Sequence, residues 1–568
     1  VSLRYTIRGG RIGERIYMEG VWLKNYQAGV PESINPDRYA SLNELLAHAC
    51  SKYKDLPAFA NMGKVLSYAE FDQQASAFAA FLQQKLQIPK GERFAIMMPN
   101  LLQYPIAMLG ILRAGCIVVN VNPLYTPDEL EHQLNDSQAI GIIVLENYAC
   151  TVAEIVHKTQ VKHVIVTKIG DVLSPPKSIL VNFVVKYIKK MVPAWSIKNF
   201  YWYKDLITQG AALTYQPVKL TNKDIAFLQY TGGTTGRAKG AILTHRNLLA
   251  NVEQVTAWVL PLLQLGKEIN ITALPLYHIF SLTGNCITFM NLGAMQILIT
   301  NPRDTAGFIK ELKKYKFTTI TGVNTLFAAL LRHPLFSSVD FSNLKVALAG
   351  GMAVQKVISE SWQQVTNNRL IEAYGLTETS PGVCINPFNI DHYNGSVGLP
   401  LPSTEISVRD DHNTELNIGE TGELWVRGPQ VMRGYWQQDK ETQNVLTADG
   451  WLRTGDIVVV DAQGFVRIVD RKKDIINISG FKVYPNEIED VLAAMPGVLE
   501  VAVVGVEDAN HGELVKAFIV KKDPNITEQT VIDYCHLHLT GYKIPKVIEF
   551  RGSLPKSNVG KILRRALR

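Results

Sequence analysis

Cysteines are few in this sequence, and their spacing gives them no shared structural role. The chain has 568 residues and 6 cysteines, and no two cysteines stand in a Cys-x-x-Cys pair. This pattern excludes a disulfide framework and indicates a reducing compartment. The segment Cys535-His536-Leu537-His538 brings three metal-ligating residues together, but its spacing does not suit a tetrahedral structural site. We therefore predict no zinc site.

Long hydrophobic runs are also missing. No apolar stretch reaches the ~20 residues that cross a bilayer as a helix. Residues 1–17 contain several arginines but lack the apolar region of a secretory signal, so we interpret them as a disordered or mis-annotated leader before Met18. We expect a soluble, cytoplasmic protein, and we leave open a peripheral contact with the inner face of the cytoplasmic membrane.

One segment bears on that membrane contact. Residues 179–195 mix large apolar side chains with Lys186, Lys189 and Lys190. Such a pattern suits a membrane interface, or a buried helix that turns a basic face to solvent. We favour the buried helix.

Charge of one sign is not strongly in excess. The formal net charge is +7, with 19% charged and 47% hydrophobic residues, which is an ordinary globular balance. This charge is compatible with an anionic ligand or membrane surface, but it is too small to indicate a nucleic-acid-binding protein. Because hydrophobic cores stop growing at about 250–300 residues, we expect at least two domains.

What is present is an alternation of strand-like and helix-like segments. Short buried strands are predicted at residues 94–98, 117–121, 142–145, 164–166 and 317–323. Apolar residues at helical spacing predict a helix over residues 304–315. Strands that alternate with helices indicate an α/β fold with a mostly parallel sheet.

The pattern changes near residue 400. Short strands at residues 405–408, 422–426 and 465–469 are separated by turn residues, which predicts a small antiparallel β subdomain. A basic link at residues 471–474 follows. The helix beginning at Pro485 and the strands at residues 501–506 and 515–520 then predict a small α+β domain. We place the domain boundary at residue 470.

A segment rich in glycine and threonine follows a predicted strand at residues 225–228. Residues 230–240 read Tyr-Thr-Gly-Gly-Thr-Thr-Gly-Arg-Ala-Lys-Gly. Glycine lets the backbone close around phosphate oxygens, while threonine hydroxyls and Lys239 add donors and charge. A plain turn is the alternative, but the density of threonine and lysine favours phosphate binding. The segment is not a Walker loop, which needs Gly-Lys-Ser/Thr in succession, so kinases and P-loop ATPases are disfavoured.

These residues closely resemble the phosphate loop of the adenylate-forming enzymes, which include acyl-CoA synthetases, peptide-synthetase adenylation domains and luciferases. Other segments resemble this family in the expected order: residues 274–280 of the acyl site, 374–379 of the adenine site, 449–456 of the ribose site, the fatty acyl-CoA synthetase signature at 464–474, the thioester segment at 479–489 and the lysine loop at 554–562. Taken alone, each suits an ordinary turn, a core histidine or a surface lysine. Their common order makes chance implausible.

The resemblance implies a role for particular residues. Nucleotide binding falls to Thr231, Gly232, Gly233, Thr234, Thr235, Gly236, Lys239, Gly350, Tyr374, Gly375, Thr377, Glu378, Asp456, Arg471 and Lys561. The implied catalytic residues are Thr231, His278, Glu378 and Lys561, of which Thr231 and Glu378 hold Mg²⁺. The implied acyl-site residues are His278, Leu282 and Gly351, and the implied CoA-site or hinge residues are Lys473, Ser479, Gly480, Phe481 and Lys482.

The resemblance runs from Met18 to the end of the chain, and residues 34–39 and 98–105 look particularly like bacterial long-chain fatty acid–CoA ligases. It implies an N-terminal domain over residues 18–470, with two helix-flanked sheets and a β subdomain at about 400–470. A small mobile α+β domain would follow at residues 471–568. The implied substrates are ATP, CoA and a long-chain fatty acid. A homodimer is left open, and no nucleic-acid partner is expected.

Two other functions were weighed. A ligase could pass its acyl group to a carrier protein instead of CoA, which an assay with both acceptors would distinguish. A nucleotide- or lipid-binding protein without catalysis is the other alternative. The presence of Lys561, Glu378 and Asp456 argues against it.

Overall fold

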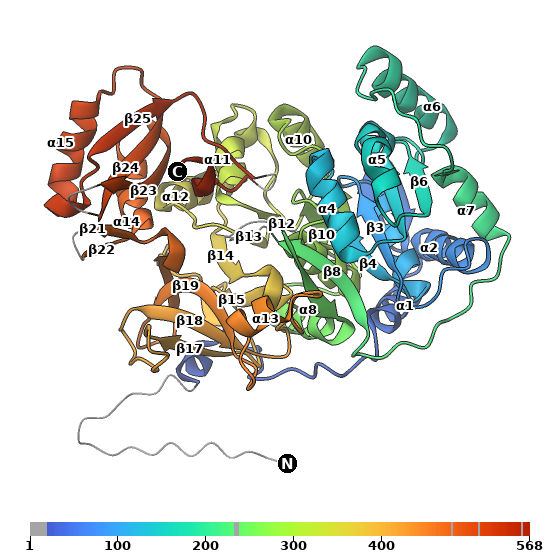
Figure 1. Ribbon diagram of the computed structural model, residues 1–568, viewed down its shortest axis with the longest axis horizontal. Coiled ribbons are helices and arrows are strands. Elements are labelled where there is room, and N and C mark those ends of the chain that lie inside the picture. The colour runs from blue at the N-terminus through green and yellow to red at the C-terminus, as the bar shows by residue number, and fades with distance from the viewer. Residues whose placement is uncertain (1–19, 232–237, 479–480, 509–511, 558–559) are drawn as a thin grey trace.

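The computed structural model describes residues 20–231, 238–478, 481–508, 512–557 and 560–568 (Figure 1). The leader expected at residues 1–17 therefore lies outside the described residues. Within the described part the strands form four sheets. No helix there is both long and apolar enough to span a bilayer.

One sheet has the strand order β7-β6-β5-β3-β4-β8-β9 and is parallel except where β9 joins β8. Its strand β5 is buried along its whole length, as expected when helices cover both faces of a parallel sheet. The strands are β3 (Arg93–Met97), β4 (Ile117–Asn120), β5 (Gly141–Leu145), β6 (His163–Thr167), β7 (Tyr201–Trp202), β8 (Ile225–Thr231) and β9 (Lys239–Thr244).

A second sheet has the order β16-β15-β14-β13-β12-β10-β11-β1-β2. It is parallel from β14 to β1 and antiparallel at both ends. The strands are β1 (Pro57–Asn61), β2 (Lys64–Ser67), β10 (Ile269–Thr272), β11 (Met295–Leu298), β12 (Thr319–Gly322), β13 (Val346–Gly350), β14 (Leu370–Gly375), β15 (Gly382–Ile385) and β16 (Leu399–Pro400). The mostly parallel α/β character predicted from the sequence is confirmed.

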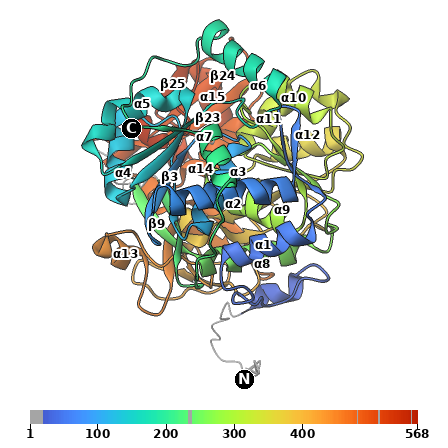
Figure 2. The same ribbon diagram turned by 90° about the vertical axis from the view of Figure 1, so that its right-hand side faces the viewer.

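Helices pack around these two sheets, and α2 lies beside α3 and α7 (Figure 2). Ser67 and Glu70 form a capping box that starts α2, because each side chain accepts a backbone N–H of the first turn. The helices up to residue 366 are α1 (Leu42–Lys52), α2 (Tyr68–Gln84), α3 (Gln103–Arg113), α4 (Pro127–Ser137), α5 (Ala149–Ile155), α6 (Pro175–Phe183), α7 (Tyr203–Ala211), α8 (His245–Val259), α9 (Thr288–Asn291), α10 (Thr305–Leu312), α11 (Asn324–Arg332) and α12 (Lys356–Thr366).

An antiparallel sheet of order β17-β18-β19-β20 follows. Its strands are β17 (Glu405–Arg409), β18 (Gly422–Arg427), β19 (Leu452–Val460) and β20 (Val466–Arg471), and α13 (Asp439–Val445) precedes β19. Buried residues of this sheet, such as Val426 and Val458, belong to the same hydrophobic cluster as Phe94 of the first sheet and Tyr104 of α3. The predicted β subdomain is therefore present and packs on the larger body.

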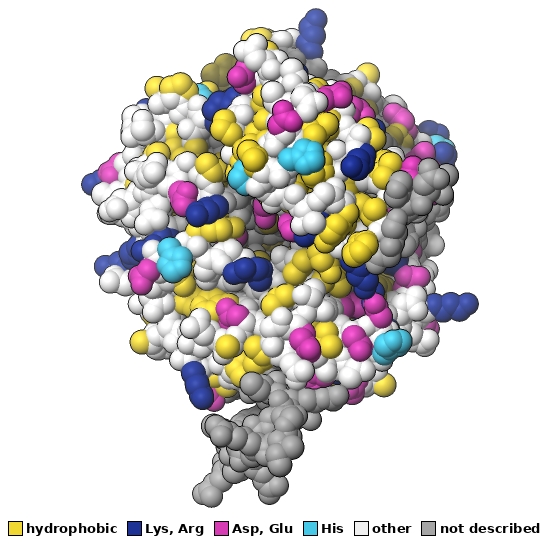
Figure 3. Space-filling model, turned by 90° about the vertical axis from the view of Figure 1, so that its left-hand side faces the viewer, with side chains coloured by type: hydrophobic (Ala, Val, Ile, Leu, Met, Phe, Trp, Pro, Cys, Tyr) yellow, Lys and Arg dark blue, Asp and Glu magenta, His cyan; other side chains and the backbone are white. Residues whose placement is uncertain are grey.

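The C-terminal part has a sheet of its own, in the order β22-β21-β24-β23 with β25 beside β24. The elements are β21 (Ile476–Ile478), β22 (Phe481–Val483), α14 (Pro485–Ala494), β23 (Val498–Asp508), β24 (Gly512–Lys521), α15 (Glu528–His538) and β25 (Val547–Arg551). Two hydrophobic clusters drawn from residues 476–567 form its core. The domain boundary expected at residue 470 stays a prediction. The face of the molecule that carries this part shows side chains of both charges interspersed (Figure 3).

The prediction of a buried helix within residues 179–195 is wrong. The segment forms α6 and its continuation, the π-helix η4 (Val184–Ile188), and both lie at the margin of the molecule (Figures 1 and 2). Ile179 and Tyr187 are exposed. The sequence pattern records two faces of the helix but does not say which face meets solvent.

Candidate active site

The two ends of the predicted phosphate loop lie side by side. Thr231 ends β8 and pairs with Lys239, which begins β9. The ammonium of Lys239 forms an ion pair with Glu441 and lies 5.4 Å from the centroid of the Tyr435 ring. Six loop positions fall outside the described residues, namely Gly232, Gly233, Thr234, Thr235, Gly236 and Arg237. The described ends thus place a hydroxyl and a cation at the mouth of the loop.

Glu378 lies next to these loop ends, because η7 (Thr377–Thr379) packs against β8 and β9. Its Oε1 accepts a hydrogen bond of 2.6 Å from the hydroxyl of Tyr435, which fixes the carboxylate. Among the described residues none donates to the other oxygen, and the side chain is only partly buried. A fixed carboxylate with one oxygen directed to no protein donor can serve a cation or a substrate.

The donor set fits Mg²⁺, which prefers oxygen ligands, keeps several waters and is commonly shared with substrate phosphates. Glu378 offers a carboxylate oxygen and Thr231 a hydroxyl on adjoining elements. No cluster of three or more His, Cys, Asp or Glu that could hold a metal occurs within the described ranges. The residues therefore suit a cation that arrives with a nucleotide better than a resident structural metal.

A chain of contacts joins the predicted adenine and ribose segments. The hydroxyl of Tyr374 donates to Asp456 Oδ2 at 2.6 Å, and Arg471 Nε lies 3.1 Å from Asp456 Oδ1. Asp456 and Arg471 face each other across β19 and β20, so strand register alone brings them together. Asp456 is buried, and its charge raises the pKa of Arg471. The ribose-site carboxylate is thus held on both oxygens by neighbouring residues of the site.

Lys561 reaches this same cluster from the C-terminal part. Ser557 N donates to Lys561 O at 2.7 Å, and the hydroxyl of Thr325 in α11 donates to Gly560 O at 3.2 Å. Burial, and then the charge of Arg471, lower the pKa of Lys561 to about 8, against the opposing charge of Asp456. The ammonium therefore lies close enough to both side chains to sense their charges.

His278 approaches Lys561 from the acyl side. Burial, with a smaller contribution from the charge of Lys561, lowers the pKa of His278 to about 4. The neutral imidazole accepts the N–H of Phe280 at Nδ1 over 3.3 Å. Its proton therefore sits on Nε2, from which it can donate to a carboxylate oxygen.

The other acyl-site and glycine positions are tightly packed. Leu282 is fully buried in the π-helix η5 (Phe280–Ile287) and belongs to the main hydrophobic cluster. A Cβ on Gly350 would lie 3.0 Å from the ring of Phe280, and one on Gly375 would lie 2.0 Å from Pro381 O. Gly351 has a positive φ of 78°. Gly350 and Gly375 need glycine because a ring or the backbone approaches closely, and Gly351 needs glycine because its backbone is left-handed.

The predicted CoA-site and hinge residues lie in different surroundings, and the charge of Lys473 is among those that lower the pKa of Lys561. Phe481 is 58% exposed and stacks on Tyr542, with ring centroids 5.0 Å apart. Lys482 lies 3.3 Å from Asp411 of the β subdomain. The pKa of Lys473 is lowered, mainly by burial. Ser479 and Gly480, the first two residues of the predicted thioester segment, lie outside the described residues.

Sequence reasoning missed three side chains of this region. Tyr435 orients Glu378, and Glu441 pairs with Lys239. Arg564 binds Asp470 and Glu489 at 3.0 and 2.7 Å. The aromatic pair that follows Gly434 was the available signal for Tyr435. The partners of Glu441 and Arg564 are set by tertiary contacts alone.

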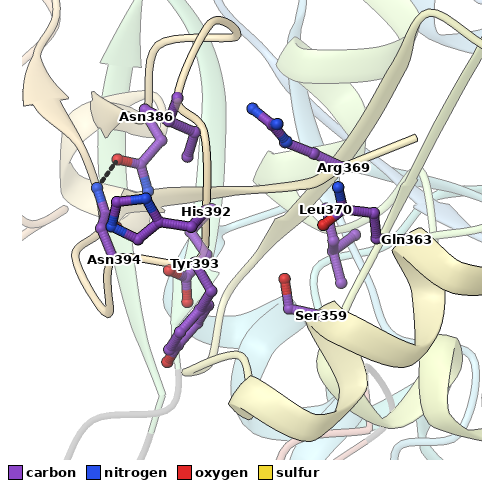
Figure 4. A pocket seen from close by; sticks show the side chains of 10 residues that line it. Ser359, Gln363, Arg369, Leu370, Asn386, His392, Tyr393 and Asn394 are labelled. Carbon is purple, nitrogen blue, oxygen red and sulfur yellow. Dashed lines mark hydrogen bonds between the residues drawn. The ribbon is translucent and has the colours of Figure 1, made fainter. Parts of the chain in front are cut away.

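A small polar pocket lies elsewhere, between α12, the start of β14 and residues 386–394 (Figure 4). Arg369, His392 and Glu372 line it, and burial raises the pKa of Glu372 to about 8. None of the residues predicted for nucleotide, acyl or CoA binding contributes to its wall. It is therefore distinct from the cluster around Asp456 and Lys561.

Known proteins match this chain over nearly its whole length. Residues 46–436 match the family described as AMP-binding enzyme, and residues 487–561 match the AMP-binding enzyme C-terminal domain. The chain is 57% identical over 551 residues to a long-chain-fatty-acid–CoA ligase of Escherichia coli O157:H7, covering 97% of this chain and 98% of that one.

Solved structures share the fold. ATP-bound MatB from Rhodopseudomonas palustris has a TM-score of 0.79 and 28% identity, with 93% of this chain and 98% of that chain covered. The anthranilate CoA ligase AuaEII in complex with anthranoyl-AMP has a TM-score of 0.82 at 24% identity, with 93% and 97% covered. The expected fold, with a large N-terminal body, a β subdomain and a small α+β C-terminal part, is thereby confirmed.

Proposed function

The chain belongs to the AMP-binding enzyme family, and from this premise we propose that it is an AMP-forming long-chain fatty acid–CoA ligase. It joins a fatty acid to CoA at the expense of ATP. The similarity to long-chain-fatty-acid–CoA ligases carries the substrate class. The placement of Lys561 against Asp456, Arg471 and His278 supports the chemistry, because it gathers the predicted nucleotide and acyl residues around one cation.

In the first half-reaction the fatty acid carboxylate attacks the α-phosphate of ATP. A bond forms between the carboxylate oxygen and phosphorus, the bond to the β-phosphate bridging oxygen breaks, and pyrophosphate leaves. Lys561 is positioned to balance the negative charge that moves between these oxygens. His278 orients the carboxylate through Nε2–H. Thr231 and Glu378 would hold Mg²⁺, which when bound supplies positive charge to the phosphates.

In the second half-reaction the CoA thiolate attacks the acyl carbonyl, and AMP leaves with its phosphate oxygen. AMP is a good leaving group, so positioning matters more than a strong base. Lys561 and the segment around Gly480 cannot both occupy one site, so the C-terminal domain rotates about Lys473 between the two steps. The acyl-CoA product would feed fatty-acid degradation or lipid synthesis.

Two experiments test this proposal. CoA-ligase activity should rise along a series of acids of increasing chain length, and best activity with acetate or an aromatic acid would contradict the substrate class. CoA and holo-carrier protein, compared as acceptors, distinguish the rival ligase. Pairing of two copies and contact with a membrane are further proposals for this protein.

A further inference from the structure

The α6–η4 segment carries a cluster of large apolar side chains that face solvent. We name this cluster the α6 patch, and its members are Ile179, Leu180, Phe183, Tyr187, Ile188 and Met191. Their exposed fractions run from 51% for Met191 to 71% for Ile179. Single exposed apolar residues are ordinary, but such a run on one element marks an interaction surface.

The segment is attached to the body by polar contacts instead of apolar packing. Lys204 donates to Ser178 Oγ at 2.8 Å, and Asn182 accepts the N–H of Gly170 at 2.8 Å. Lys186 lies 2.8 Å from Glu146. None of the apolar residues from Ile179 to Met191 belongs to a hydrophobic cluster of the described chain.

One stripe of the helix therefore faces the body with polar side chains, and another faces solvent with apolar side chains. Ser178 and Asn182, four residues apart, point to the body. Ile179, Phe183 and Tyr187 follow the same four-residue spacing one position later, so they share a different stripe of the helix. The ring centroids of Phe183 and Tyr187 lie 5.2 Å apart, and neither side chain belongs to the main hydrophobic cluster.

The charged residues of the segment itself are of one sign. Between Asp171 and Asp205 the sequence has no acidic residue, and its lysines there are Lys177, Lys186, Lys189, Lys190, Lys198 and Lys204. Lys189 and Lys190 are exposed, and neither forms an ion pair with any residue that the structure describes. The segment thus presents apolar side chains flanked by unneutralised positive charge at the margin of the molecule (Figure 2).

We propose that the α6 patch docks this protein on the surface of an anionic lipid bilayer. The apolar side chains enter the boundary between headgroups and acyl chains, and the lysines meet the negatively charged headgroups. A second copy of the chain is a poorer occupant, because a two-fold interface on this patch would bring the same lysines together. Charge complementarity therefore selects the lipid surface.

Docking would also suit the substrate, a point that rests on the proposed function. A long acyl chain partitions into bilayers, because each buried CH₂ contributes roughly 0.8 kcal/mol. An enzyme held at that surface meets its substrate where the substrate is concentrated. Acyl-CoA synthesis with dispersed acid in solution does not require the patch.

The test is co-sedimentation of the full chain with vesicles of phosphatidylcholine alone and of phosphatidylcholine mixed with phosphatidylglycerol. The unmodified chain should bind the mixed vesicles and bind weakly to phosphatidylcholine. The variant Phe183→Ser/Tyr187→Ser/Ile188→Ser should lose at least about tenfold in binding. The variant Lys189→Glu/Lys190→Glu should bind the mixed vesicles about fivefold or more weakly for each lysine changed. This loss of binding should shrink as the salt concentration is raised.

Matched controls use exposed side chains outside the patch. Leu335→Ser/Val357→Ser/Leu537→Ser changes three comparably exposed apolar residues, and Lys310→Glu/Lys440→Glu changes two exposed lysines. Both control variants should bind vesicles as the unmodified chain does. Equal losses in the patch and control variants, or equal binding to both vesicle types, would overturn the proposal.

Two further readouts separate this proposal from the others. If the patch variants change the sedimentation coefficient of the free protein and leave vesicle binding intact, the patch is a self-association surface and the proposal is wrong. Ligase activity with dispersed acid should be the same in all variants. Vesicle binding is measured without substrates, so it can fail while the ligase assignment stands, and the reverse also holds.

Discussion

The guanidinium of Arg564 lies 3.0 Å from the carboxylate of Asp470, and the two residues come from opposite sides of the expected hinge. Asp470 is fully buried and also accepts the N–H groups of Arg471 and Asn486 at 2.7 Å. Arg471 in turn binds Asp456. The pairs Arg564–Asp470 and Arg471–Asp456 therefore link the C-terminal part to the predicted ribose-site carboxylate in this orientation.

Breaking that link should affect the two half-reactions unequally. Asp470→Asn removes one of the carboxylate charges that face Arg564 and keeps the shape of the side chain, while the pair with Glu489 stays within the C-terminal part. We expect the rate of pyrophosphate release to fall by about tenfold or more. A loss of ~1.4 kcal/mol in the stability of the docked orientation corresponds to that factor. Thioester formation from pre-formed acyl-adenylate should change much less. Glu549→Gln, which breaks a pair of 2.8 Å with Lys516 inside the C-terminal sheet, is the control and should spare both.

The lowered pKa of Lys561 predicts a pH dependence for adenylation. The ammonium is the major form below its pKa of about 8 and is lost as the pH rises through that value. The kcat/KM for pyrophosphate release without CoA should therefore decline above pH 8, because this ratio reports the free enzyme. Lys561→Arg keeps its charge at these pH values and should remove the decline. A decline that persists in Lys561→Arg would assign it to another group.

Lys561→Ala tests the division of labour more directly. We expect it to lose adenylation by orders of magnitude, because the charge that moves between carboxylate and phosphate is no longer balanced. The variant should still convert pre-formed acyl-adenylate and CoA into acyl-CoA. Equal loss of both half-reactions in a folded protein would contradict the rotation mechanism.

The hydrogen bond from Tyr435 to Glu378 should tune the use of Mg²⁺. Tyr435→Phe leaves the carboxylate without its 2.6 Å donor. Adenylation should fall by about tenfold, as a charge-assisted bond is worth ~1.5 kcal/mol or more, and the Mg²⁺ concentration for half-maximal rate should shift. Tyr26→Phe removes another 2.6 Å hydroxyl bond, to Pro400 O, and should leave adenylation unchanged. Glu378→Ala should be far more severe than Tyr435→Phe.

Leu282 should influence the acyl chain length. It stands four residues after His278, where some fatty acyl-CoA synthetases carry a bulky tryptophan. Leu282→Trp adds volume at a fully buried position and should lower kcat/KM most for the longest acids. In the unmodified chain each added CH₂ should raise kcat/KM by about fourfold while room remains, which corresponds to ~0.8 kcal/mol. A uniform loss across all acids would indicate general overpacking instead.

The fold could largely be predicted because the spacing of hydrophobic residues and the residues that cap helices are local signals in the sequence. The strand expected at residues 142–145 is β5, and the helix expected from residue 304 begins at Thr305, since Asp304 caps it by accepting Gly307 N at 3.0 Å. The predicted helix end at residue 315 overshoots Leu312, the last residue of α10. Helix ends depend on tertiary context, which a periodic pattern does not contain.

The site was predictable only where residues stand in a motif. Tyr435 is 57 residues from Glu378 in sequence and Glu441 is 202 from Lys239, so their contacts exist only once the β subdomain packs against β9. The exposure of α6 escaped prediction for the same reason. An amphipathic pattern fixes two faces, and only the packed body determines which one is covered.

The way α6 is fastened gives it a stability of its own. A few polar bonds and no share in the hydrophobic clusters mean that this segment can unfold without disturbing the two sheets. Its amide hydrogens should therefore exchange with solvent by local opening, well before those of α2 or β5, whose exchange waits for the whole body to open. A bound surface that covers the segment would slow that exchange there and nowhere else. This weakly attached helix is thus also a sensitive reporter of what the protein touches.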